Sequence, residues 1–227
     1  MDVSVVVPLP ISVADNMAAA FLPLVTAPPL VRIVGTLLGA VAESGRIVVA
    51  AAEPLIVDVD AALASDNLGA VSVAAVTGSA SRADCLKAAL EYLRHASFST
   101  THVLVHDIAS PLVSAEVAQR VIDGLQGGGA VVMPALAVTD SVKAVDVHGS
   151  VSATVDRSVL RAIQFPRGFA IDALAGLLAQ HTSDDFDEIA VALGAAAPIT
   201  FVDGDPHAFR AELPRDTEFF EAIIASR

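Results

Sequence analysis

The sequence predicts one three-layer α/β domain over residues 1–227, in which helices cover both faces of a mostly parallel sheet. Short runs rich in valine and isoleucine alternate with longer segments whose apolar residues recur at helical spacing. Hydrophobic residues make up 54% of the chain and aromatic residues only 4%, so the core must be aliphatic, as in a sheet buried on both faces. The 227 residues contain no repeat and no linker, which favours a single domain.

The first half of the chain alternates strands with helices. Continuous apolar runs, typical of strands buried on both faces, predict strands at residues 3–8, 46–51, 71–76 and 102–106. Apolar residues at helical spacing predict helices at residues 30–43, 54–64, 79–96 and 114–125. Pro54 suits a first helical turn, Ser114 is an expected N-cap, and Gly127 begins a glycine run that ends the fourth helix.

The second half contains an insertion. A strand at residues 130–138 is followed by two short apolar runs, residues 142–147 and 151–155, joined by a His148-Gly149 turn. We therefore expect a β-hairpin arm at residues 139–157 that projects from the domain and pairs with a second subunit. The core pattern then resumes, with elements expected at residues 172–180 (helix), 184–193 (helix), 199–203 (strand) and 216–225 (helix).

Composition excludes several classes of function. The formal net charge of −13 argues against binding nucleic acid, because the chain would repel a phosphate backbone. The single cysteine, Cys85, allows no intramolecular disulfide and fits a reducing compartment. The six histidines show no metal-ligand spacing. The apolar stretches are shorter than the roughly 20 residues of a membrane span and no signal peptide is evident, so we expect a soluble, cytoplasmic protein without membrane contact.

Ligands of open α/β sheets bind beyond the carboxyl ends of the strands, so those loops carry the candidate residues. The loop after the first strand begins Pro8-Leu9-Pro10, contains no glycine, and is followed by no basic residue before Arg32. A phosphate-binding loop needs glycines and free N–H groups, and proline has no N–H. This pattern favours a plain structural loop over a triphosphate site.

Two further strand ends have two interpretations each. Gly78, Ser79 and Arg82 follow the third strand, where they form either an ordinary capped helix start or a contact to an anion or a base edge. Asp107 follows the fourth strand, where it either binds a metal or a hydroxyl or caps the next turn. Arg82 is a poor match for the helix dipole, which suggests another role.

Basic residues are scarce and gather after the hairpin. Arg157, Arg161 and Arg167 either hold a phosphate or serve as surface charges and dimer ion pairs. Arg210 follows the strand at residues 199–203 and could point back at a phosphate. Asp140 flanks the end of the long strand.

Five motifs occur in a fixed order: Val-Leu-Val-His-Asp at 103–107, Asp140 with Lys143, Asp156-Arg157 followed by Gln164-x-Pro-x-Gly-Phe, Ser-Asp-Asp at 183–185, and Val-Asp-Gly-Asp-Pro at 202–206. This order resembles the methylerythritol phosphate cytidylyltransferases of isoprenoid precursor synthesis, over nearly the whole chain. The resemblance implies a Rossmann-like nucleotidyltransferase fold and a homodimer joined by the arm. It also implies CTP and methylerythritol phosphate as substrates, with Mg²⁺ as the cofactor.

The resemblance implies a nucleotide side of the site. Pro8, Gly78, Ser79 and Arg82 would contact the nucleotide, with Gly78 and Ser79 at the cytosine ring. Arg210 would contact a phosphate of CTP, where the family has a lysine.

The resemblance also implies an acceptor side. Asp107 would lie near the metal and the methylerythritol hydroxyls, and Arg157 would hold the methylerythritol phosphate. Asp140 would bind the substrate, as would Ser183, which stands where the family often has threonine.

The chain departs from the family pattern at the groups that hold the triphosphate. The loop at residues 8–15 lacks both family glycines and the arginine, and Asp15 places an anion there. Leu24 replaces a lysine, Ser110 an arginine, and Phe165 a hydroxyl near the substrate. Losing one charge-stabilising group in phosphoryl transfer costs about 10³–10⁵ in rate. We therefore interpret the chain as a divergent homologue with impaired or no catalysis. The alternatives are weak cytidylyltransferase activity, a non-catalytic binding or regulatory paralogue, and a scaffold that heterodimerises with an active relative.

Overall fold

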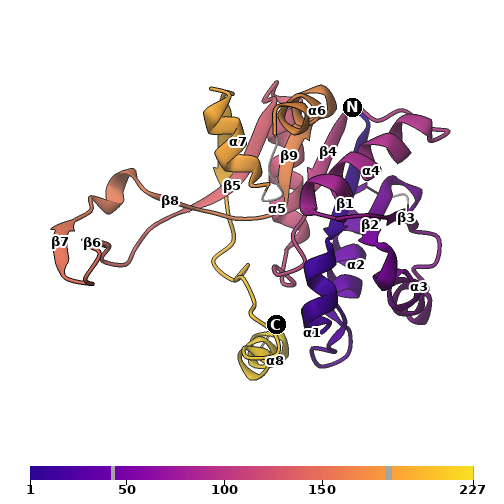
Figure 1. Ribbon diagram of the computed structural model, residues 1–227, viewed down its shortest axis with the longest axis horizontal. Coiled ribbons are helices and arrows are strands. Elements are labelled where there is room, and N and C mark those ends of the chain that lie inside the picture. Colours follow the sequence, from indigo (N-terminus) through magenta and orange to yellow (C-terminus); the bar gives the residue numbers. More distant parts are fainter. Residues whose placement is uncertain (42–43, 182–185, 227) are drawn as a thin grey trace.

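A twisted central sheet forms the middle layer of the domain (Figure 1). The computed structural model describes residues 1–41, 44–181 and 186–226. Across the sheet the strands lie in the order β10 (Ile199–Asp203), β5 (Val131–Ala137), β9 (Arg167–Ala170), β4 (His102–Val105), β1 (Val3–Leu9), β2 (Ile47–Ala52) and β3 (Ser72–Val76). The pairs β1–β2, β1–β4, β2–β3 and β5–β10 are parallel, which confirms the predicted α/β class.

The continuous apolar run that predicted the first strand becomes the centre of the sheet. All seven residues of β1 are buried, and Val5 lies opposite Ile47 of β2 on one side and Leu104 of β4 on the other. A strand covered on both faces must be apolar on both faces, so its sequence shows no alternation.

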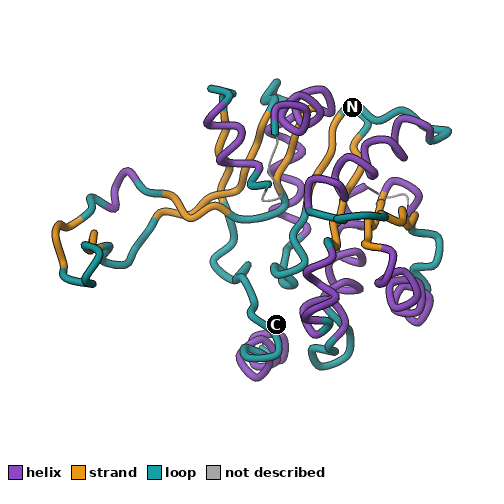
Figure 2. Tube along the Cα trace, in the orientation of Figure 1, coloured by secondary structure: helices purple, strands orange, loops and turns teal. Residues whose placement is uncertain are grey.

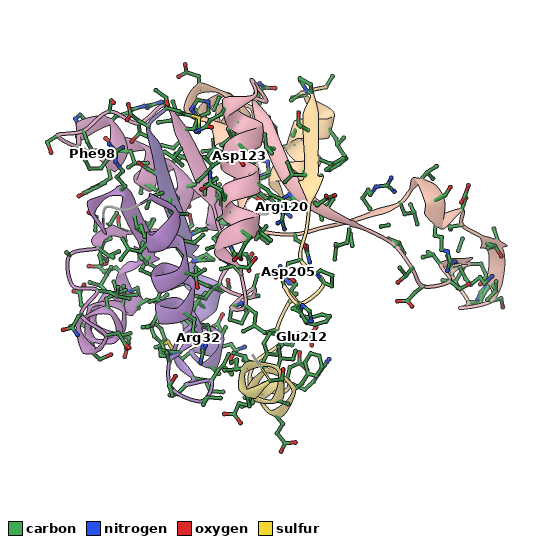
Figure 3. All side chains as sticks on the ribbon, turned by 180° about the vertical axis from the view of Figure 1, so that it is seen from behind. Arg32, Phe98, Arg120, Asp123, Asp205 and Glu212 are labelled. Carbon is green, nitrogen blue, oxygen red and sulfur yellow. The ribbon has the colours of Figure 1, made fainter. Side chains whose placement is uncertain are left out.

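Helices form the two outer layers. The helices α4 (Arg82–His95) and α6 (Ile171–Gln180) lie side by side in front of the sheet in Figure 1, whereas α5 (Ala115–Gln126), seen in front in Figure 3, covers the back with α2 (Pro29–Val41). The remaining helices are α1 (Ala18–Phe21), α3 (Ile56–Ser65), α7 (Glu188–Gly194) and α8 (Thr217–Ala225). No helix of the described residues is both long and apolar enough to span a bilayer.

The sequence did not predict β9, which runs antiparallel between β4 and β5. Of its residues, Arg-Gly-Phe-Ala, only Phe169 favours strands, so pairing with β4 and β5 forms this strand more than local propensity does. Gly168 permits the close approach of α5, because a Cβ atom there would lie 2.5 Å from Cγ1 of Val121. A short strand, β8 (Arg161–Ile163), also pairs antiparallel with β5.

Two helix boundaries differ from the prediction. The helix expected from Ser79 begins at Arg82, because Ser81 and Asp84 form a capping box that fixes the N-terminus. The helix expected over residues 184–193 begins at Glu188, with the Asp187 side chain accepting a hydrogen bond from the Ile189 amide. Residues 184 and 185 lie outside the described part of the chain.

The predicted hairpin is present and projects away from the sheet (Figures 1 and 2). Its strands are β6 (Lys143–Val145) and β7 (Val151–Thr154), which form a separate antiparallel sheet. A short 3-10 helix, η4 (Arg157–Val159), leads back toward β8. Val147 is 96% exposed, so the arm presents apolar side chains to solvent.

The C-terminal segment crosses the carboxyl edge of the sheet to reach α8. The Arg120 side chain on α5 anchors its start by donating to the carbonyl oxygens of Asp203 and Gly204, and Figure 3 shows Arg120 beside the loop that carries Asp205. Further on, α8 helps to form a second small core, composed of Leu24, Leu112, Ala211, Leu213 and Phe220. The C-terminus is thus tied to the loops that surround the candidate site.

Candidate functional site

A pocket of about 530 Å³ lies beyond the carboxyl ends of β1, β3 and β4, where the topology predicted a site. One wall is apolar, with Pro8, Pro10, Ile11 and Val13 from the first loop facing inward together with Phe186. The other wall is polar. Its side chains are Ser79, Ser81, Arg82, Asp107 and Arg210. The volume is in the range of small-molecule sites.

The first loop offers few hydrogen-bond donors to this pocket. Pro8 and Pro10 have no N–H group. The Ile11 amide donates to the carbonyl oxygen of Ala80 at 2.9 Å, and the Val13 amide donates to that of Pro10 at 2.9 Å. Residues 11–16 form a 3-10 helix, so the amides from Val13 onward serve its own turns, and among the amides after Ile11 that of Ser12 alone has no acceptor in that helix. The loop therefore lacks the converging free amides of a phosphate cradle.

The charge of the first loop also differs from the expectation. Asp15 is exposed and is not among the residues that line the pocket, so it does not face the ligand space directly as the sequence suggested. Ser12 is the exposed polar residue of the loop that does line the pocket. Leu24, which occupies the expected place of a lysine, is fully buried in the small C-terminal core.

The turn after β3 is organised around Asp84. Gly78 adopts a φ of +78°, which favours glycine, and starts the turn. The hydroxyls of Ser79 and Ser81 donate to the Asp84 carboxylate at 2.6 and 2.8 Å. These hydrogen bonds hold the pKa of Asp84 below its ordinary value. This turn is therefore a capped helix start, and Ser79 and Ser81 also line the pocket, whereas the contact to an anion or a base edge stays a prediction.

Asp107 occupies the centre of the polar wall. Its carboxylate accepts a hydrogen bond from the Ala109 amide at 2.9 Å, and the Arg82 guanidinium lies 3.3 Å away. Arg210 forms a looser ion pair with it at 3.7 Å. Burial would raise the pKa of Asp107, but the two guanidiniums and the amide outweigh burial and lower the pKa. The carboxylate is thus ionised and already balanced by protein cations.

A buried ion network lies behind Asp107 and was not predicted. Glu188 of α7 is 1% exposed and accepts from Arg82 Nε at 2.8 Å through one carboxylate oxygen. Its other oxygen pairs with Arg167 of β9. Phe165 packs against this network, because the guanidinium of Arg167 lies over the Phe165 ring, 4.2 Å from the ring centre. Pairing with Glu188 is therefore the other role of Arg82, which its poor match to the helix dipole suggested.

His106 precedes Asp107 but does not face the pocket. It is fully buried, its Nε2 atom pairs with the carbonyl oxygen of Ser110 at 2.9 Å, and its ring meets Phe165 edge-on. Burial lowers the pKa of His106 to about 4, so the ring is neutral at pH 7. It supports the turn after β4 and is not among the residues that line the pocket.

The predicted site residues fall into two groups. Those that line the pocket are Pro8, Ser79, Arg82, Asp107 and Arg210, whereas Gly78 is not among the lining residues. Asp140 instead lines a neighbouring hollow of about 420 Å³ that it shares with Arg210 and Phe165. Arg157 lies on the projecting arm, where it donates to the carbonyl oxygen of Thr139. Ser183 lies outside the described residues.

The basic cluster expected after the hairpin is divided by the fold. Arg167 is buried in β9, whereas Arg157 and Arg161 are exposed at the arm. Arg161 donates to the carbonyl oxygens of Ser158 and Leu160, within the arm itself. Proximity in sequence therefore did not mean a shared anion site within one chain.

Comparison with known proteins identifies the family. The model of the 2-C-methyl-D-erythritol 4-phosphate cytidylyltransferase family matches residues 13–226. The chain belongs to this cytidylyltransferase family. A cytidylyltransferase of this name from Saccharopolyspora erythraea is 35% identical over 186 residues, which is 81% of the chain and 82% of that relative.

Two other similar proteins support the same family assignment. The Bifunctional enzyme IspD/IspF of Paracoccus denitrificans is 40% identical over 153 residues, which is 67% of this chain but 39% of that longer protein. The crystal structure of the cytidylyltransferase from Thermus thermophilus superposes with a TM-score of 0.72 at 27% identity, covering 99% of this chain and 100% of that one. The nucleotidyltransferase fold is therefore established.

Proposed function

We propose that the chain is a non-catalytic member of the cytidylyltransferase family, which keeps the pocket around Asp107 but does not hold the triphosphate of CTP. The observation that carries this proposal is the first loop. Pro8 and Pro10 have no N–H group, the Ile11 amide is bound to the Ala80 carbonyl, and no side chain of residues 8–16 is cationic. A triphosphate would meet few donors and no positive charge on that side of the pocket.

The cations of the polar wall do not compensate for this loss. Arg82 is bound to two carboxylates, those of Glu188 and Asp107. Arg210 remains, with a side chain that is 65% exposed. Loss of one charge-stabilising group costs about 10³–10⁵ in phosphoryl-transfer rate, and the first loop presents none. The rate of cytidylyl transfer should fall by at least that much.

The polar wall also fits Mg²⁺ poorly. Mg²⁺ in phosphate sites is held by one or two carboxylates together with substrate phosphates. Asp107 is the one carboxylate among the described residues that line the pocket. Both of its oxygens already contact protein donors or cations. A divalent ion would have to displace those arginines, so we assign it no step.

The arm is proposed to join two copies of the chain. Its exposed apolar side chains are Val145, Val147 and Val151, and Val159 is exposed just after it on η4. Because a monomer gains nothing from presenting these valines to water, contact with a partner is the simplest account. Arg157 lies on the same arm, so any contact it makes with methylerythritol phosphate would be at the pocket of a partner. A catalytically active relative of this family is the second candidate partner, because the same arm would serve a heterodimer.

Pyrophosphate release tests the proposed function. The purified chain is mixed with CTP, Mg²⁺ and methylerythritol phosphate, and the Saccharopolyspora erythraea relative is assayed alongside it as the positive control. We expect release at least about 10³-fold slower than by the relative, because the triphosphate is not held. A rate within tenfold of the relative would refute the proposal and support a working cytidylyltransferase.

A further inference from the structure

The charges that line the pocket limit the kind of ligand it can accept. Among the described lining residues the ionised side chains are Arg82, Asp107 and Arg210. Arg82 donates its Nε to Glu188 at 2.8 Å and places Nη1 3.3 Å from Asp107, so the protein neutralises its charge. Arg210 makes a single contact of 3.7 Å with Asp107 and stays 65% exposed, which leaves most of its five N–H donors for a ligand.

One exposed guanidinium matches one phosphate group. Arginine binds phosphate through two parallel hydrogen bonds, which fixes a single group in place. A second and third phosphate would find no further unpaired cation among the described lining residues, because Arg82 is already paired and the first-loop residues Pro8, Pro10, Ile11 and Val13 are uncharged. Of the first-loop residues that line the pocket, Ser12 alone has a side-chain donor and none is charged, so each further phosphate would lose hydration without a compensating charge.

The rest of the pocket suits an uncharged ring system. Its volume of about 530 Å³ exceeds what a phosphate alone would need, and its first wall is formed by aliphatic side chains and Phe186. A mostly apolar pocket with a few placed polar groups is the usual form of a site for an organic ligand. The Ser12 hydroxyl, exposed on the first loop, is available to a sugar hydroxyl.

We propose that this pocket binds a nucleoside monophosphate in preference to a triphosphate, with its phosphate on Arg210 and without a divalent cation. The inference rests on the proposed function, because it takes the pocket to be the nucleotide pocket of the family. It goes further by naming the ligand that the remaining charges select.

The test is a calorimetric titration of the full chain with cytidine, CMP and CTP, each in EDTA and in Mg²⁺. We expect CMP to bind at least about tenfold more tightly than cytidine, because a charge-assisted bond to phosphate contributes roughly 1.5–3 kcal/mol. EDTA should not change the Kd of CMP, and CTP should bind no more tightly than CMP.

Two variants locate the phosphate. Arg210→Gln should remove the advantage of CMP over cytidine and leave the Kd of cytidine unchanged. Arg215→Gln is the matched control, because Arg215 lies on the same segment, is 75% exposed, and pairs with Glu212 and Asp216 outside the pocket lining. That variant should bind all three ligands as the unmodified chain does.

Several outcomes would overturn the inference: tighter binding of CTP than of CMP in Mg²⁺, equal binding of CMP and cytidine, no effect of Arg210→Gln, or no binding of any of the three. These failures are separable from failure of the proposed function. Absent nucleotide binding together with absent pyrophosphate release would refute the ligand and leave the loss of catalysis standing. Pyrophosphate release at a rate near that of the relative would refute the proposed function.

Discussion

Replacing Glu188 with alanine is expected to lower the free energy of unfolding by about 3–5 kcal/mol, the usual cost of removing one partner from a buried ion pair. Glu188 is 1% exposed and holds Arg82 and Arg167 through its two carboxylate oxygens. Without it, two guanidiniums that are largely shielded from water lose their common anion. Hydration can replace that anion only in part, because the Arg82 and Arg167 side chains are 17% and 11% exposed.

The measurement is urea denaturation followed by circular dichroism. Glu91→Ala serves as the control, because Glu91 is an exposed glutamate of α4, and its loss should change stability by less than about 0.5 kcal/mol. If Glu188→Ala were as stable as that control, the buried network would not be the link between α4, α7 and β9.

Charging the arm is expected to abolish dimer formation. The variant carries Val147→Asp together with Val151→Asp, at positions that are 96% and 66% exposed. Burying an unpaired carboxylate at an interface costs several kcal/mol, and about 4 kcal/mol corresponds to a thousandfold weaker association. Light scattering should give twice the 23.2 kDa of one chain for the unmodified protein and a single-chain mass for the variant.

Val57→Asp is the matched control for the arm. Val57 lies on α3 and is 79% exposed, so it matches the arm valines in residue type and in exposure but lies outside the arm. That variant should remain dimeric. An unmodified chain with the mass of one copy, or a dimer that survives both arm substitutions, would exclude the arm as the contact between subunits.

The sequence predicted the fold well where burial determines residue type. The apolar runs of β1 and β2 lie in the middle of the sheet. Strands of this kind can be predicted from their own residues, without knowledge of the neighbouring strands. The position of Asp107 followed from the rule that ligands meet the carboxyl ends of strands. By contrast, β9 pairs with β4 and β5 on its two sides, and only Phe169 of its four residues favours strands.

The candidate site was predicted less completely than the fold. Arg82 and Glu188 are 106 residues apart, and no spacing rule links positions so distant in the chain. The lack of cations and glycines in the first loop was visible in the sequence, but the capture of the Ile11 amide by Ala80 was not. Nor was the exposed, outward position of Asp15. Long-range side-chain pairs of this kind depend on tertiary packing and leave no local pattern.

The central claim is that the first loop cannot hold a triphosphate, and a positive charge at Ser12 should restore part of that ability. Ser12 is exposed and lines the pocket, so Ser12→Lys should strengthen CTP binding by about tenfold, and CMP binding less. Gln126→Lys adds the same charge at the opposite edge of the sheet, near Met1, and should change neither.

The direct measurement is titration of CTP with Mg²⁺ into the unmodified chain and into Ser12→Lys. We predict that Mg²⁺ adds nothing to CTP binding by the unmodified chain and that the lysine variant alone gains affinity. Tight, Mg²⁺-dependent binding of CTP by the unmodified chain, unchanged by Ser12→Lys, would contradict the account of the first loop.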